Sequence, residues 1–263
     1  MVLNNFDKNL IELENLIKSS HSTVILSGAG ISTLSGIPDF RSSHGIYSDS
    51  WNNMNVEDIL DIGFFRLHPD VFYAWAKDFW YKLEDYEPNI VHTTLAKLEN
   101  KGYLDGIFTQ NIDMLHARAG SKKVYEVHGS AKHHYCTKCG EHYDYKAIAP
   151  IVHRGEVPYC KRCGGLIKPD IVFYGEGLNG STLMRANHLF SDCDLCLVLG
   201  SSLVVQPAAS FPLYTARGSG KIVVVNKQPT SLDSIAALHF DDLNQLFAPL
   251  SEFVDTLVDK KSK

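Results

Sequence analysis

The fold of this chain can be worked out from the segment Thr23-Val24-Ile25-Leu26-Ser27-Gly28-Ala29-Gly30-Ile31-Ser32-Thr33. Its first residues are apolar or β-branched, which is typical of a short buried strand. The strand runs into glycines followed by serine and threonine, and there an α/β sheet lets backbone N–H groups approach a phosphate. The segment therefore predicts a nucleotide-binding loop at the carboxyl end of a strand.

This loop differs from the fingerprint of dehydrogenases that use nicotinamide cofactors. Gly36 follows Gly30 by six residues where the fingerprint has three, and no acidic residue ends a second strand about 20 residues further on. We therefore expect a nucleotide that is not used for hydride transfer. Residues 36–41 come next, and they form either a solvated loop with a Pro-Asp turn or a flap in which Phe40 and Arg41 close over the nucleotide.

The rest of the chain alternates helical and strand-like patterns. Apolar residues recur at helical spacing in residues 4–19, 55–62, 69–84, 90–99 and 243–258, and strand-like runs cover residues 104–109, 124–127, 171–174, 194–199 and 222–225. This alternation is typical of a doubly wound parallel sheet of the Rossmann-like α/β class. The aromatic-rich helical stretches interrupt that pattern, and we interpret them as an insertion that supplies core or the wall of a groove.

Four cysteines predict a metal site. Cys136, Cys139, Cys160 and Cys163 have the spacing C-x2-C-x20-C-x2-C, in which two tight turns each offer a pair of sulfurs to a tetrahedral zinc ion. Unlinked buried thiols or two disulfides are the alternatives, but nothing in the sequence indicates an oxidising compartment. Because all four ligands are cysteine, we expect a structural Zn²⁺ in a small zinc-ribbon domain. The remaining two cysteines share a strand-like run and are expected to be buried as small hydrophobic residues.

These patterns divide the chain into three units. We expect a Rossmann-like nucleotide-binding domain of residues 1–44, 86–131 and 169–263, a helical insertion of residues 45–85, and a zinc ribbon of residues 132–168.

Polar residues follow several of the predicted strands. Gln110-Asn111-Ile112-Asp113 comes after one strand, His128 after the next, and Gly200-Ser201-Ser202 and Asn226-Lys227 follow the last two. Because ligands bind beyond the carboxyl ends of parallel strands, we expect these groups to lie close together. Asn111 or Asp113 can also serve as the N-cap of a helix that extends to residue 118.

Charge and hydropathy disfavour several classes of function. The 263 residues carry a formal net charge of −5, with no basic block beyond the C-terminal lysines. Binding of nucleic acid through its phosphates is therefore disfavoured. No apolar run approaches the roughly 18 residues of a membrane helix, and the N-terminal residues lack a signal pattern. We expect a cytoplasmic protein that acts as a monomer, without a nucleic-acid or membrane partner.

Eight motifs taken in order resemble those of the sirtuins, which are NAD-dependent protein-lysine deacylases. They are Gly28-Ala29-Gly30-Ile31-Ser32, Gly36-Ile37-Pro38-Asp39-Phe40-Arg41, Thr109-Gln110-Asn111-Ile112-Asp113, His128-Gly129, the four cysteines, Phe173-Tyr174-Gly175-Glu176, Gly200-Ser201-Ser202 and Val225-Asn226. The resemblance implies that nicotinamide leaves NAD and that the acyl-lysine oxygen attacks the ribose. A histidine then acts as general base on a ribose hydroxyl, which gives lysine and O-acyl-ADP-ribose.

The resemblance also assigns roles to residues. His128 would be the general base, with Asn111 as the second catalytic residue. The NAD-binding residues would be Gly28, Ala29, Gly30, Ser32, Thr33, Asp39, Phe40, Arg41, Gln110, Asn111, Ile112, Asp113, His128, Gly200, Ser201, Ser202, Asn226, Lys227 and Leu243. An acyl-lysine peptide segment would be the protein partner, lying as an added strand between Val172, Tyr174, Gly175 and Glu176 on one side and Val204 and Val205 on the other.

One departure from the family pattern bears on the acyl group. Sirtuins that prefer succinyl or malonyl lysine carry a Tyr-x-x-Arg pair that neutralises the substrate carboxylate. Here the nearest match is Tyr73-Ala74-Trp75-Ala76, with alanine in place of the arginine. Because burying an unpaired carboxylate is costly, we expect a neutral acyl group, acetyl first and then longer chains.

Two alternatives share part of this pattern. An NAD-dependent ADP-ribosyltransferase would use the same nucleotide motifs, although the peptide-groove motifs and His128 favour deacylation. A zinc-ribbon binding module with a degenerate nucleotide fold would need a basic ribbon surface. The ribbon's lysines and arginines are diluted by Glu141, Asp144 and Glu156, so we disfavour that alternative.

Overall fold

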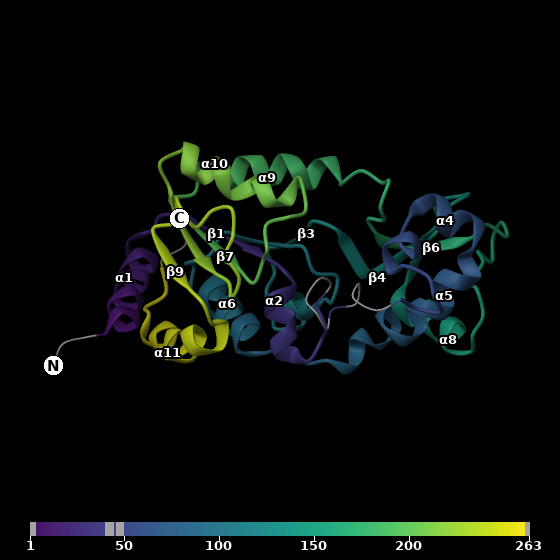
Figure 1. Ribbon diagram of the computed structural model, residues 1–263, viewed down its shortest axis with the longest axis horizontal. Helices are drawn as coiled ribbons and strands as arrows, with labels where there is room; N and C mark the ends of the chain where they lie inside the picture. Colours follow the sequence, from purple (N-terminus) through teal and green to yellow (C-terminus); the bar gives the residue numbers. More distant parts are fainter. Residues whose placement is uncertain (1–3, 40–44, 46–49, 261–263) are drawn as a thin grey trace.

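The protein is described from a computed structural model, which covers residues 4–39, 45 and 50–260. The chain forms two lobes that lie side by side along the long axis (Figure 1). The sheet lobe is built on a six-stranded sheet, and the small lobe, made of residues 50–85 and 129–173, contains a three-stranded sheet. Within the described residues, every helix is too short or too polar to cross a membrane.

All six strands of the larger sheet run parallel, in the order β3-β2-β1-β7-β8-β9. They are β1 (Thr23–Ser27), β2 (Gly106–Thr109), β3 (Val124–Glu126), β7 (Leu195–Leu199), β8 (Lys221–Val225) and β9 (Leu238–Phe240). The doubly wound parallel sheet is therefore confirmed, although β9 has no counterpart among the strand-like runs of the sequence. The order reverses between β1 and β7, and the carboxyl ends of these strands flank the switch point where ligands bind.

Helices cover both faces of this sheet (Figure 1). One layer consists of α1 (Asn5–Ser19), α6 (Ile90–Asn100) and α11 (Leu243–Thr256), and the other of α9 (Gly180–Asp192) and α10 (Phe211–Arg217). Side chains of β1 alternate between the two layers, because Ile25 packs in the first core and Val24 and Leu26 in the second. Cys193 and Cys196 are buried in that second core, as expected of small hydrophobic residues.

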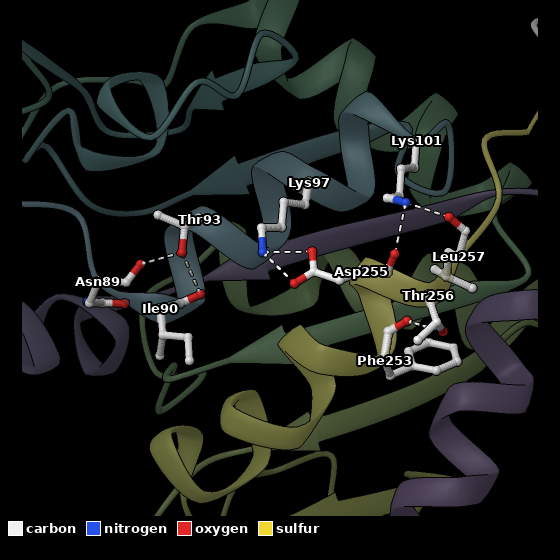
Figure 2. A network of polar contacts seen from close by, with 9 residues as sticks. All are labelled: Asn89, Ile90, Thr93, Lys97, Lys101, Phe253, Asp255, Thr256 and Leu257. Atoms are coloured by element: carbon white, nitrogen blue, oxygen red, sulfur yellow. Dashed lines mark hydrogen bonds and ion pairs between the residues drawn. The ribbon is translucent and has the colours of Figure 1, made fainter.

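The first helical layer is closed by polar contacts between α6 and α11 (Figure 2). The ammonium group of Lys97 lies 2.8 Å from Asp255, and Lys101 donates to the carbonyl oxygens of Asp255 and Leu257. A cation beside the last carbonyls of a helix is favourable because those oxygens have no intrahelical donor. The pair between Lys97 and Asp255 is exposed, so it fixes the helix position more than it adds stability.

The small lobe combines the two insertions. Its sheet has the antiparallel order β5-β4-β6. The elements are β4 (Gly129–Cys136), β5 (His142–Asp144), β6 (Ile167–Ile171), α3 (Val56–Ile59), α4 (Ile62–Leu67), α5 (Pro69–Asp78), η2 (Trp80–Asp85) and α8 (Tyr145–His153). Aromatic residues of the helical insertion, Phe65, Phe72 and Trp75 among them, share one core with Ile148 and Ile167 of the ribbon. The two insertions, expected as separate units, are therefore one packed body.

The strand-like run at residues 171–174 is not part of the parallel sheet. The strand there is β6, which ends at Ile171 and pairs antiparallel with β4, so that Gly129 lies opposite Ile171. The prediction placed this run with the nucleotide-binding strands because its apolar pattern fits either environment. Of the residues that follow β6, Phe173 is buried in the aromatic core of the helical insertion.

The two glycine loops of the sheet lobe touch each other through their backbones. A Cβ on Gly30 would lie 2.7 Å from Cα of Gly200, and a Cβ on Gly28 would lie 2.7 Å from the carbonyl oxygen of Gly200. Gly200 has a φ of +60° and its N–H donates to Val225, while the N–H of Gly30 donates to the Gly200 carbonyl at 2.8 Å. The glycines therefore permit the close approach of the two loops. This packing role is separate from the contact with a phosphate that the sequence predicts for them.

Gly30→Ala should lower the free energy of unfolding by about 2 kcal/mol, because the new methyl group would overlap backbone atoms that have no room to move. Gly180→Ala is the matched control. A Cβ on Gly180, the first residue of α9, meets nothing within 4 Å, so stability should stay the same or rise slightly. Urea denaturation of both variants measures the difference, and equal midpoints would contradict the close approach.

Candidate active site and metal centre

A cavity of about 1060 Å³ lies between the two lobes. Its wall in the sheet lobe is largely polar and comes from the carboxyl ends of β1, β2, β7 and β8. Its wall in the small lobe is apolar, with Leu60, Trp80, Ile171 and Phe173. Ordinary ligand pockets measure about 300–1,000 Å³, so this cavity suits one large ligand or two ligands together.

Most of the predicted site residues line this cavity. They are Gly28, Ala29, Gly30, Thr33, Asp39, Gln110, Asn111, Ile112, His128, Val172, Tyr174, Gly175, Glu176, Gly200, Ser201, Ser202, Val205, Asn226, Lys227 and Leu243. Ser32 and Asp113 are buried behind the wall, and Val204 is 64% exposed beside Val205. Phe40 and Arg41 lie outside the described residues, so the expected flap stays a prediction.

His128 lies at the junction of the two lobes, between β3 and β4. Its Nδ1 is 3.1 Å from the carbonyl oxygen of Gln110. A carbonyl oxygen only accepts, so Nδ1 carries the proton and Nε2 carries the lone pair of the neutral ring. Gly129 follows at a φ of +77°, and a Cβ there would lie 2.0 Å from the carbonyl oxygen of Asp170. The crossing into the small sheet at this residue therefore requires glycine.

A buried hydrogen-bond network orients Asn111. Its Nδ2 donates to the carbonyl of Gly28 at 3.0 Å and to Oγ of Ser32 at 2.8 Å. Both amide hydrogens are thus used inside the protein, and Oδ1 is the atom that Asn111 can offer to a ligand in the cavity. The side chain is 6% exposed, and the network links it to the glycine loop of β1.

The network continues to Asp113. Ser32 Oγ donates to its Oδ2 at 2.5 Å, and the N–H of Leu115 donates to its Oδ1 at 2.9 Å. Asp113 therefore accepts the N–H of the first residue of α7 (Leu115–Arg118), but the N-cap position belongs to Met114, so neither Asn111 nor Asp113 is the N-cap expected from the sequence. Burial raises the pKa of Asp113, and these two hydrogen bonds oppose that shift.

The sequence missed the apolar wall of the cavity. Leu60 and Trp80 lie in the aromatic-rich insertion, which the sequence marks only as core or groove wall, and only the folding of the small lobe brings them beside Ile171. Gln228 and Asp241 at the opposite end were also missed. Their only signal was their position just past β8 and β9, and β9 itself went unrecognised.

The four predicted metal ligands converge. Sγ of Cys136 lies 3.5 Å from that of Cys163, Sγ of Cys139 lies 3.6 Å from that of Cys160, and all four sulfurs are within 4.8 Å of one another. These distances exclude disulfides, whose sulfurs are about 2.05 Å apart. A tetrahedral site with zinc–sulfur bonds of about 2.3 Å places its sulfurs about 3.8 Å apart, so the cluster fits zinc.

Each pair of cysteines is closed by a glycine turn. The N–H of Gly140 donates to the carbonyl of Cys136, and that of Gly164 to Cys160, both at 2.9 Å. Both glycines have φ near +70°, which an L side chain rarely adopts. Tyr143 also donates to Sγ of Cys160 at 3.1 Å. The two similar turns hold all four sulfurs, so no ligand position is left for substrate and the metal is structural.

Comparison with known proteins agrees with this geometry. The model of the Sir2 family matches residues 28–207. An NAD-dependent protein deacetylase of Thermotoga maritima is 46% identical over 230 residues, which cover 88% of this chain and 92% of that protein. NAD-dependent protein deacylase 2 of Archaeoglobus fulgidus is 41% identical, over 84% of this chain and 86% of its own.

Solved structures show the same fold. A Sir2 structure with a deacetylated p53 peptide and 3′-O-acetyl-ADP-ribose superposes with a TM-score of 0.85 at 43% identity, covering 93% of this chain and 96% of its own. A Sir2 structure bound to a propionylated peptide gives a TM-score of 0.81, also at 43% identity, over 94% and 95% of the two chains.

Cys160→Ser should remove the bound zinc and unfold the small lobe. The free energy of zinc binding is also folding free energy, and the cysteine turns share one core with the helical insertion. Cys193→Ser is the control, because it changes a buried cysteine in the other lobe. Zinc content by elemental analysis and near-ultraviolet circular dichroism should fall only for Cys160→Ser. A folded, zinc-loaded Cys160→Ser protein would contradict the structural role.

Proposed function

The chain belongs to the Sir2 family of NAD-dependent protein deacetylases, and on that premise we propose a role for each group around the cavity. The protein removes acyl groups from lysine side chains, with NAD and water as co-substrates and free lysine, nicotinamide and O-acyl-ADP-ribose as products. The observation that carries the assignment of roles is the position of His128, where the polar wall of the cavity meets the apolar wall.

His128 acts as the general base. Since its Nδ1–H is engaged with the carbonyl of Gln110, Nε2 accepts the proton of a ribose hydroxyl. The ring is then positively charged, and its hydrogen bond to Gln110 becomes charge-assisted and therefore stronger. When NAD is bound, it supplies the ribose carbon that the acyl oxygen attacks as nicotinamide leaves. A neutral imidazole carries one lone pair, and that lone pair can accept a proton.

The polar wall suits the dinucleotide. No side chain projects from Gly28, Gly30 or Gly200, so backbone groups are accessible beside Ser201 and Ser202 for phosphate and ribose. We assign Asn111 Oδ1 to the ribose next to nicotinamide, and Asn226, Lys227 and Leu243 to the adenosine end.

Ile112 and Asp113 are assigned to the nicotinamide carboxamide. Ile112 lines the cavity, while Asp113 lies behind the wall. Each oxygen of Asp113 accepts a hydrogen bond, Oδ2 from Ser32 and Oδ1 from Leu115. A carboxylate has about four acceptor sites, so the side chain can still accept from an amide N–H.

The acyl-lysine peptide adds as a strand between residues 172–176 and 203–206. Tyr174 pairs through its backbone with Leu60 and Ile62, which ties one edge of the first segment to the helical insertion. Tyr174 and Val204 expose 41% and 64% of their surface on the two sides of the proposed path. Main-chain pairing of this kind gives affinity with little side-chain selectivity, which suits an enzyme that acts on many segments.

The acyl group lies against the apolar wall and is neutral. Among the described residues that line the cavity, His128 and Lys227 carry the only basic side chains, and Lys227 follows β8 at the far end from Leu60 and Trp80. Tyr73 donates its hydroxyl to the carbonyl of Ile167. The hydroxyl group of Tyr73 is therefore bonded within the core and is not available to a substrate carboxylate.

We further propose that the enzyme works as a cytoplasmic monomer.

Incubation with an acetyl-lysine peptide and NAD should give deacetylated peptide, nicotinamide and O-acetyl-ADP-ribose in equal amounts by mass spectrometry. His128→Ala should lower kcat by about 10²–10⁴-fold, because the base is removed, while zinc content and the fold stay unchanged. Substantial activity in His128→Ala would refute the role of base. Release of nicotinamide with the peptide still acetylated would favour ADP-ribosyl transfer.

A succinyl-lysine peptide should react at least about 100-fold more slowly than the acetyl peptide in kcat/KM, because the apolar wall offers no cation to a buried carboxylate. A butyryl peptide is the control, since it matches the succinyl chain in length without the charge, and it should remain a substrate. Comparable rates for succinyl and butyryl peptides would refute the neutral-acyl assignment.

A further inference from the structure

Lys168 is the only lysine or arginine among the buried residues that the structure describes, with 1% of its side chain exposed. Removing an ammonium group from water costs several kcal/mol, so its contacts must compensate. Its Nζ donates to the carbonyl of Ile171 at 2.6 Å and of Pro169 at 3.2 Å, and lies 2.9 Å from Oε2 of Glu176. The ammonium group also lies 3.9 Å from the ring centre of Phe173, within the range of a cation–π contact.

The partner carboxylate closes a turn. Oε2 of Glu176 accepts from the N–H of Phe173 at 2.8 Å, and the N–H of Glu176 donates to the carbonyl of Phe173 at 3.0 Å. Gly175 lies inside this turn with a φ of +87°. Because Lys168 contacts both Ile171 and Glu176, it holds the two ends of the segment 171–176 together.

That segment lines the cavity, whereas Lys168 does not. The N–H of Val172 donates to the carbonyl of His128 at 2.9 Å, so the same segment is also bonded to the residue assigned as the base. Burial lowers the pKa of Lys168, and the Glu176 carboxylate opposes that shift. The lysine therefore acts on the site through the backbone that it supports.

We propose that Lys168 is a positioning residue for the peptide substrate. Its ammonium group fixes the Ile171 carbonyl and the Glu176 carboxylate, so that residues 172–176 keep the backbone path on which a peptide strand can add. This inference rests on the proposed path of the acyl-lysine peptide. An uncharged side chain of the same length would fill the space, but the Ile171 carbonyl would lose the Lys168 donor and the Glu176 carboxylate would lose its ion-pair partner, and the segment would relax.

Steady-state kinetics of Lys168→Met test this role. We expect the KM for an acetyl-lysine peptide to rise about tenfold, while the KM for NAD and kcat change less than about twofold. Lys168→Arg keeps the charge and should recover most of the peptide affinity. Because Lys168→Met leaves a carboxylate without its ion pair, the neutral double variant K168M/E176Q is measured with both single variants. The effects on peptide KM should be far from additive, as expected for two residues in contact.

Two further variants make the outcome decisive. Lys146→Met changes an exposed lysine on α8 and should leave all constants unchanged. Gly175→Ala forces an alanine into a left-handed backbone position in the same segment and should raise peptide KM on its own. If Gly175→Ala raises peptide KM and Lys168→Met does not, or if all constants worsen in step with the melting temperature, the role of Lys168 is refuted. If neither variant changes peptide KM, the peptide path itself is refuted.

Discussion

The architecture depends on a backbone contact between two loops. Gly28 and Gly30 follow β1, Gly200 follows β7, and their main chains approach closer than any side chain would allow. That contact brings the carboxyl ends of the two central strands together at the switch point of the sheet. Asn111 bonds the carbonyl of Gly28, and Gln110 bonds Ser201, so β2 is tied to the same point. These glycines, together with the side chains bonded around them, form part of the polar wall of the cavity.

The cavity combines two chemical environments, and each environment is supplied by a different lobe. The sheet lobe offers amides, hydroxyls and backbone groups, as an anionic dinucleotide requires, while the small lobe offers aliphatic and aromatic surface. His128 lies where the chain passes from one sheet to the other. Its ring is oriented by the sheet lobe through Gln110, and its backbone is bonded to the small lobe through Val172. The residue proposed as the base is thereby bonded to both walls of the cavity.

The sequence predicted what depends on local patterns and missed what depends on pairing between distant segments. The alternation of strand-like and helical patterns was enough for the parallel sheet, and the cysteine spacing was enough for the metal site. The run at residues 171–174 was misassigned because an apolar strand carries no mark of its partner, and here the partner is β4. Leu60 and Trp80 were missed as cavity residues because an apolar side chain has the same sequence pattern in a core and in the wall of a cavity. Burial of Ser32 and Asp113 behind that wall is likewise invisible in the motifs that contain them.

The strand order also determines how much of the chain must be synthesised before neighbouring strands can pair. β1 ends at Ser27, but its neighbour β7 begins at Leu195, so that pairing must wait until most of the chain has left the ribosome. The core of the small lobe, by contrast, uses residues from Val56 to Phe173 and can close earlier. Pairing across so long a separation is slow, because the closure entropy is lost before the contacts compensate for it. Every residue of the small-lobe core, its metal-binding cysteines included, thus precedes β7 in the chain, whereas the central pairing of the nucleotide-binding sheet requires residues from Leu195 onward.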